Sequence, residues 1–193
     1  MSWLPLVMTL ALTALSVSAP QQRLGDARRL TAPETFTSNL NIVGPAGAAA
    51  ATITIKIDRY SAEADRTAVE TALKAGSAEF LAALRKAPVV GTLTMAGQTF
   101  DIRFAREQPI QNGRTIVLVT DKPAFFVGAG AIAPKPREGY DVALLKFRMD
   151  DSGLGYDGIM AAAAKVKMGA SGIEIDDYAE KPIEMRTVTR AIK

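Results

Sequence analysis

Residues 61–106 read SAEADRTAVETALKAGSAEFLAALRKAPVVGTLTMAGQTFDIRFAR, a pattern that predicts one helix followed by a two-stranded hairpin. In the first part, large apolar residues recur at helical spacing, at Val69, Leu73, Phe80 and Leu84. Gly76 interrupts the pattern at a cost of roughly 1 kcal/mol relative to alanine. Burial of each large side chain contributes roughly 1.5–3 kcal/mol, which outweighs the glycine. We therefore expect one inserted helix over about 62–86, kinked or restarting at the glycine.

The ends of this helix also have sequence signals. Ser61 is placed to cap the first free N–H groups, and Ser77 to cap a restart after the glycine. Pro88 ends the helix. We expect Leu73, Phe80 and Leu84 to pack against apolar strand residues that are close in sequence. Those strand residues are Ile53, Ile55, Phe100, Ile102 and Phe104.

The rest of the chain predicts strands. The clearest is 51–58, where Ile53, Ile55 and Ile57 alternate with polar residues, which favours antiparallel pairing with one wet face. Residues 114–120 are β-branched on both faces and predict a central strand covered on both sides. The other strands are expected at 35–43, 90–95, 100–104, 142–149, 156–168, 173–178 and 183–189. The alanines at 161–164 also leave a helical turn open there.

These elements predict an α+β fold that is mostly antiparallel β. The expected architecture is a sandwich or partly closed barrel of about nine or ten strands, with the helix inserted after the second strand. The alternative is an open antiparallel sheet with the helix packed across one face. Neither arrangement needs an internal repeat, and none is found in the sequence.

Composition excludes several classes of function. The chain has 193 residues, of which 48% are hydrophobic and 22% charged, so it can bury a sizeable core. A net charge of +3 makes no electrostatic case for nucleic acid. The absence of cysteine removes disulfides, thiol chemistry and cysteine metal sites. The absence of histidine removes the commonest general base and most zinc and copper sites.

Residues 1–19 resemble a secretory signal peptide in pattern. Residues 4–15 form an apolar run too short to span a bilayer, and small residues precede a cut after Ala19. Residues 20–33 then form a flexible lead-in, and 34–193 a single β-rich domain without a transmembrane span. An exported protein without disulfides fits a bacterial periplasm or the cell exterior.

Residues 124–133 hold the candidate ligand-binding site. The segment is too apolar for an ordinary surface loop and too rich in glycine for a regular strand. Its large apolar side chains could line the mouth of a cavity for an apolar small molecule. These candidate residues are Phe125, Phe126, Val127 and Ile132. Gly128-Ala129-Gly130 lacks the third glycine and the helix of a dinucleotide site, so no cofactor is expected.

Asp150, Asp151 and Asp157 surround one turn and are the candidate metal ligands. Carboxylates of this kind could hold calcium through oxygen ligands or serve a glycosidase, whereas solvated acidic turns are common. The spacing is not that of a calcium-binding loop.

Three functions follow from these observations. The first is an exported, non-catalytic protein that binds an apolar small molecule or lipid. The second is a structural or interaction protein of the envelope, whose partner is another envelope protein. The third is a hydrolase that uses carboxylates alone. A filled interior favours the second function over the first, and facing carboxylates in a deep cleft favour the third.

Overall fold

Period-two alternation produces strands with one buried face. In β2 (Gly47–Ile57), Ile53, Ile55 and Ile57 are fully buried, while Thr52 and Thr54 are exposed. The structure, a computed structural model, describes residues 32–44, 47–125 and 137–191. Its other strands are β1 (Glu34–Gly44), β3 (Gly91–Met95), β4 (Gln98–Ile110), β5 (Gly113–Thr120), β6 (Val142–Asp150), β7 (Leu154–Gly169), β8 (Gly172–Tyr178) and β9 (Ile183–Arg190).

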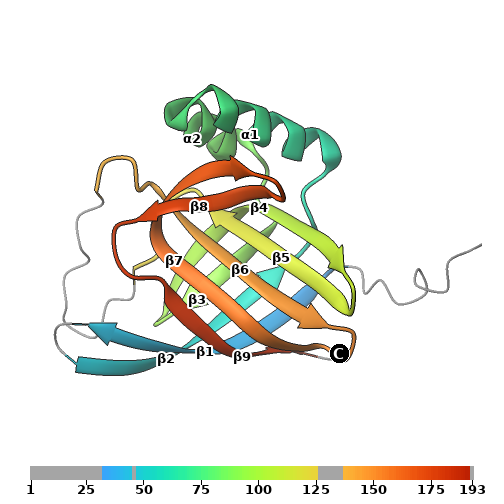
Figure 1. The fold of residues 1–193 in the computed structure, drawn as a ribbon, viewed down its shortest axis with the longest axis vertical. Coiled ribbons are helices and arrows are strands. Elements are labelled where there is room, and N and C mark those ends of the chain that lie inside the picture. The colour runs from blue at the N-terminus through green and yellow to red at the C-terminus, as the bar shows by residue number, and fades with distance from the viewer. Residues whose placement is uncertain (1–31, 45–46, 126–136, 192–193) are drawn as a thin grey trace, which may run out of the picture.

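The sheet closes into an eight-stranded antiparallel barrel with a ninth strand outside it (Figure 1). Strands β1 to β7 pair in chain order, β7 pairs with β9, and β9 pairs with β1. Among the described residues, β8 pairs only with the last part of β7. The α+β, mostly antiparallel fold is therefore confirmed, with full closure of the barrel. Closure leaves no free edge within the barrel wall.

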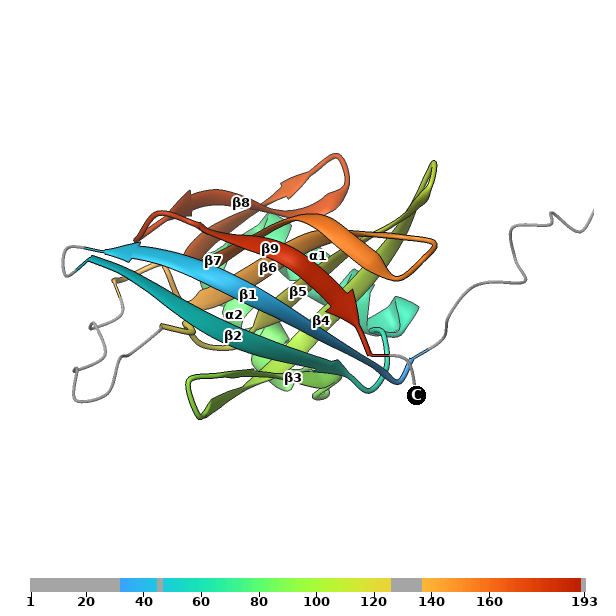
Figure 2. The same cartoon turned by 90° about the horizontal axis from the view of Figure 1, so that it is seen from below.

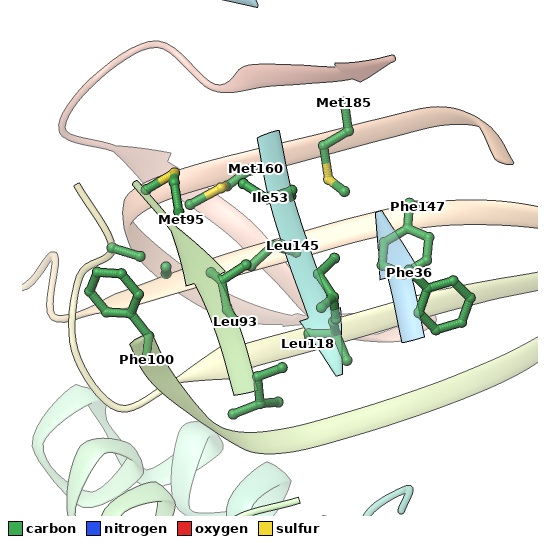
Figure 3. Packing of buried hydrophobic residues seen from close by; sticks show 14 of the residues in the cluster. Phe36, Ile53, Leu93, Met95, Phe100, Leu118, Leu145, Phe147, Met160 and Met185 are labelled. Carbon is green, nitrogen blue, oxygen red and sulfur yellow. The ribbon is translucent and has the colours of Figure 1, made fainter. Parts of the chain in front are cut away.

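The barrel interior is the main hydrophobic core. Phe36 and Phe147 meet edge to face, with ring centroids 5.3 Å apart at 66°. Figure 3 shows this pair on one side of the cluster and Met95, Met160 and Phe100 on the other. Figure 3 also shows Met185 near Phe147, so aromatic rings and methionines occur in both parts of the interior.

A second core lies outside the barrel, under the helices. The helices α1 (Glu63–Ala75) and α2 (Ser77–Lys86) lie outside one wall, while β9, β1, β2 and β3 lie on the other side (Figure 2). The buried side chains of this outer cluster are Val69, Leu73, Phe80, Leu84, Ala87, Phe104, Val119, Val142, Leu144, Ala161, Ala164 and Ile173. The amphipathic helices thus cover the outward apolar residues of β4 to β8.

The β7–β8 hairpin reaches back over the same wall. At its tip, the Ser171 carbonyl accepts a hydrogen bond from Gln108 Nε2 of β4 at 2.7 Å. Arg106, also on β4, forms an ion pair with Glu70 of α1 at 2.8 Å. These contacts tie the hairpin and the first helix to one strand of the barrel.

The predicted partners of the helix are wrong except for Phe104. Ile53, Ile55, Phe100 and Ile102 lie in the barrel interior, away from the helix cluster. Phe104 is the exception because of a β-bulge in β4, where Ile102 pairs with Thr120 but Phe104 pairs with Val119. The extra residue reverses the inside–outside alternation. Phe104 therefore joins the helix cluster, and its neighbour Ala105 joins the interior.

A second helix begins after Gly76, which confirms the expected restart rather than the expected kink. The predicted N-caps, Ser61 and Ser77, are wrong. The N-cap residues are Ala62 and Gly76, and neither has a side-chain capping hydrogen bond. Ser61 is buried, and its Oγ accepts a hydrogen bond from the Ala105 N–H at 3.0 Å. The Ser61 hydroxyl therefore binds a distant strand residue and does not cap the helix, as the local sequence predicted it would.

The four alanines at 161–164 belong to a strand with a bulge. Leu144 pairs with Ala161 and Val142 with Ala164, so β7 has one extra residue there. The carbonyls of Ala162 and Ala163 accept hydrogen bonds from the N–H groups of Ala124 (2.8 Å) and Ala179 (3.0 Å). The small side chains let β7 bend where these connecting segments approach.

Candidate ligand-binding end of the barrel

The two ends of the barrel have opposite chemistry. One, the ion-paired end, contains Glu34, Tyr60, Glu107, Arg114 and Arg190. These residues come from the start of β1, the segment after β2, and strands β4, β5 and β9. Only the barrel brings them together, since Glu34 and Arg114 are 80 residues apart in sequence.

Glu34 is the centre of the ion-paired end, and its side chain is 0% exposed. Its carboxylate accepts hydrogen bonds from Arg114 Nη2 at 2.6 Å and from the Tyr60 hydroxyl at 2.6 Å. Arg190 Nε lies 2.8 Å from Oε1 as an ion pair that lacks the alignment of a hydrogen bond. Arg114 Nη1 also donates to Glu107 at 2.8 Å. Two carboxylates therefore balance two guanidinium groups.

The pKa shifts at this end follow from burial and pairing. Burial raises the pKa of the Tyr60 hydroxyl, while the charge of Arg114 opposes that rise. Burial by itself lowers the pKa of Arg114, but its hydrogen bonds to Glu34 and Glu107 give a net upward shift. Both groups therefore keep their ordinary protonation state at neutral pH. We interpret this cluster as a structural closure of the barrel, because its charges are already paired with one another.

The opposite end, here the Phe125 end, is apolar. Met95, Phe125, Tyr140 and Met160 are buried there with small alanines between them. Half-buried apolar residues pack against this part of the cluster from neighbouring strands and from the segment after β8. These residues, here called the rim, are Ile42, Ala51, Ala179 and Ile183. Flexible methionines beside small side chains can adjust their shape to a guest molecule.

Three cations stand over aromatic rings at the Phe125 end. Lys122 Nζ lies 5.5 Å from the centroid of the Phe100 ring. Arg137 Cζ and Lys165 Nζ lie 5.4 Å and 5.3 Å from the centroid of the Tyr140 ring. These distances fit cation–π contacts.

The Tyr140 hydroxyl donates a 2.5 Å hydrogen bond to Asp177 on β8. This hydrogen bond raises the pKa of Tyr140 and lowers the pKa of Asp177. The tyrosine is therefore held in place by a carboxylate at its hydroxyl and by two cations over its ring.

The structure places one of the four predicted ligand-binding residues. Phe125 is 9% exposed and packs into the barrel interior just after Ala124. Phe126, Val127 and Ile132 lie outside the described residues. The segment therefore starts inside the Phe125 end, and the ligand-binding role of these four residues stays a prediction.

The three predicted metal ligands are used in different ways. Asp150 Oδ1 accepts hydrogen bonds from the N–H groups of Ser152 and Leu154 and from the Ser152 hydroxyl. The hydrogen bond from the Ser152 hydroxyl is the largest cause that lowers the pKa of Asp150. Asp157 pairs with Arg148, and Asp151 is exposed. Within the described ranges, no group of three or more acidic residues could hold a metal ion.

A small groove lies outside the barrel, between α2 and the strands β6 and β7. It encloses about 250 Å³, including open solvent. Ser77, Phe80 and Leu81 line one side, and Val142, Ala164 and Val166 line the other. Phe80, Val142 and Ala164 belong to the cluster under the helices, so the groove is a gap at the border of that packing.

Sequence reasoning missed the residues that distinguish the two ends. The ion pairs at Glu34 and the cations over Phe100 and Tyr140 join segments far apart in the chain, and no local pattern marks them. The one usable signal was the alternation of β1 and β5. It puts Glu34 on the same face as Phe36, and Arg114 on the same face as Ile116.

Over the part of the chain that the structure covers, no helix is both long and apolar enough to cross a membrane. Comparisons with known proteins add no identity to this geometry. No known protein family matches the chain, and no curated protein or solved structure matches it.

Proposed function

We propose that the protein is an exported, non-catalytic binding protein that takes an apolar small molecule or lipid into the Phe125 end of its barrel. The observation that carries this proposal is the difference between the two ends. One end is closed by buried ion pairs, and the other has a half-buried apolar rim beside methionines and alanines. Eight-stranded up-and-down barrels have an interior that side chains can fill or that can hold one small ligand.

Export is the part of the proposal that rests on sequence alone. It comes from the signal-peptide pattern of residues 1–19, which lie outside the described residues. A fusion of residues 1–22 to a reporter should send the reporter across the membrane and be removed from it. A reporter that stays uncut in the cytoplasm would contradict export without affecting the binding proposal.

Ligand binding is tested first with protein purified from its own host. Native mass spectrometry should detect a co-purifying apolar molecule, and an extracted sample should then bind an apolar fluorescent probe. A small molecule that enters this end by displacing its apolar side chains is expected to bury most of its surface. Protein that carries no molecule and binds no probe would contradict the proposal.

Two isoleucines on adjacent strands provide a matched test of the binding end. Ile183 of β9 lies opposite Met160 and packs against the interior, while Ile159 of β7 lies opposite Glu184 and is 38% exposed. Ile183→Asn should weaken probe binding about tenfold, because loss of a large apolar contact costs about 1.5 kcal/mol. Ile159→Asn should leave binding unchanged. Equal effects of the two substitutions would remove the rim from the proposed site.

The second candidate is a structural or interaction protein of the envelope. Tight packing near Gly158 favours it, because a Cβ there would lie 2.9 Å from Met185 Cβ and 3.0 Å from Phe147 Cβ. That part of the interior is therefore filled by side chains. A complex with another envelope protein that forms without any bound small molecule would support this candidate. We do not propose the carboxylate hydrolase, because its candidate carboxylates lie on an exposed turn, where Asp150 binds the Ser152 and Leu154 N–H groups and Asp157 pairs with Arg148.

A further inference from the structure

We infer that the ligand of the Phe125 end is amphipathic, with an apolar body and an anionic head that the cations Lys122, Arg137 and Lys165 recognise. This inference rests on the proposed function, since it specifies the chemistry of the molecule that the barrel takes. The head group is a carboxylate or a phosphate, both of which carry oxygen acceptors that lysine and arginine bind.

The positions of the cations carry the inference. Lys122 follows the end of β5, Tyr140 precedes β6, and the Thr120 hydroxyl joins these strands by accepting a hydrogen bond from the Ala143 N–H at 2.9 Å. Lys165 lies on β7 directly after Ala164, the last residue there that pairs with β6, and is opposite Asp177 of β8. The cations stand over Phe100 and Tyr140, both members of the interior cluster. An apolar body among these rings would thus have its head close to positive charge.

These three cations differ from Arg114 and Arg190 at the ion-paired end in their carboxylate partners. Among the described residues, Lys122, Arg137 and Lys165 form no ion pair. Asp177 of β8 lies opposite Lys165 and accepts the hydrogen bond of the Tyr140 hydroxyl, and its negative charge also attracts Lys165 and Arg137. Asp176 pairs with Lys167 at 3.0 Å. Asp177 thus offsets part of the charge of the three ring-stacked cations, and the excess positive charge can pair with an external anion. At the other end, Glu34 and Glu107 balance Arg114 and Arg190.

The experiment compares ligands that share one alkyl chain and differ in the head group. Dodecanoate, dodecyl phosphate and dodecanol each displace an apolar fluorescent probe from the full-length mature protein, below their micelle concentrations. Three exposed ion pairs between the head group and the cations should together raise affinity about tenfold. Both anions should therefore bind about tenfold more tightly than the alcohol, which has no charge. Added salt should reduce this preference, because it screens exposed charges. The anion with the higher affinity identifies the head group.

A triple variant, Lys122→Gln, Arg137→Gln and Lys165→Gln, should bind the anions and the alcohol equally. The matched control replaces three exposed helix cations, Lys74→Gln, Arg85→Gln and Lys86→Gln, and should keep the preference. Alcohol that binds as tightly as the anions in the unmodified protein would overturn this inference and leave the proposed function intact. Failure of all three ligands to bind would overturn both. If the triple variant does not fold, the salt dependence of the unmodified protein decides: a preference for anions that is insensitive to salt also overturns the inference.

Discussion

The two ends of the barrel bury different kinds of side chain. At the ion-paired end, Arg114 and Arg190 point into the barrel and pair with a carboxylate that has no exposed side-chain surface. At the Phe125 end, the interior is closed by aromatic and apolar side chains, and the cations lie over the rings. Buried charges that pair with one another restrict the geometry of one end, whereas apolar contacts leave the other end adjustable.

The ion-paired end is therefore interpreted as a rigid closure, and the Phe125 end as the binding end. A buried ion pair adds little net stability over an apolar substitute, yet removal of one partner leaves an uncompensated charge. Apolar side chains at a rim have no such constraint and can repack. The comparison therefore predicts where substitutions should damage the fold and where they should be tolerated.

The largest effect is expected at the ion-paired end. Glu34→Gln should lower the free energy of unfolding by about 3–5 kcal/mol, because Arg114 and Arg190 lose their buried counter-charge. Urea denaturation followed by circular dichroism measures this change.

The matched control is Glu184→Gln. Glu184 pairs with Arg186 on the surface, where both side chains are largely exposed. This substitution should change the free energy of unfolding by less than about 1 kcal/mol. A Glu34→Gln variant as stable as the control would mean that the buried charges do not hold the barrel end closed.

A smaller difference is expected between two methionines with equal exposure at opposite ends. Met149 and Met160 are both 0% exposed, in β6 and β7. Each change to alanine should cost about 2–5 kcal/mol, with Met149→Ala about 1–2 kcal/mol the more costly. Met149 Sδ fills the space at Gly155, 2.8 Å from where a Cβ would lie, while Met160 lies opposite the half-buried Ile183, which can move.

Thermal or urea melts of the two methionine variants, without added ligand, measure this difference. An apolar ligand should then stabilise the Met149→Ala protein, whose binding end is intact, more than the Met160→Ala protein. If Met160→Ala proves the more destabilising, the Phe125 end is the more tightly packed of the two.

The smallest effect concerns the hydrogen bond between Tyr140 and Asp177. Removal of the hydroxyl in Tyr140→Phe should raise the pKa of Asp177 towards its ordinary value, because that hydrogen bond is the main cause of the lowered pKa. A lowered pKa stabilises the fold above the unfolded-state pKa, and this stabilisation is lost as the pH falls through the folded-state pKa. The variant should therefore differ from the unmodified protein near neutral pH and converge with it in acid.

Titration of the Asp177 carboxyl by nuclear magnetic resonance measures this shift. Asp150 offers an internal control, because its own lowered pKa depends mainly on Ser152 and should not move. An unchanged pKa at Asp177 would show that the cations Lys165 and Arg137, rather than the hydroxyl, keep its carboxyl ionised.

Much of the strand content could be predicted from the sequence. Alternation in 51–58 and apolar residues on both faces of 114–120 depend only on neighbouring residues, and β2 and β5 have the burial that these patterns predict. The candidate site was predictable only as far as Phe125, because an apolar, glycine-rich segment is a local feature. Its cations and rim residues come from β1, β2, β7 and β9 and from the segments beside β5, β6 and β8, and nothing local relates them.

The sequence by itself determined the strands, a helical region interrupted at Gly76 and the antiparallel pairing, because periodicity and turn residues act over short distances. Tertiary structure decided the closure of the barrel, since the β7–β9 and β9–β1 pairings depend on the twist and stagger of the whole sheet. It also decided which apolar residues meet the helices. One extra residue between Ile102 and Phe104 puts the side chains after it on the opposite face of β4 from the one that strict alternation predicts. The position of this bulge is fixed by pairing with β5, and the alternation of β4 itself does not reveal it.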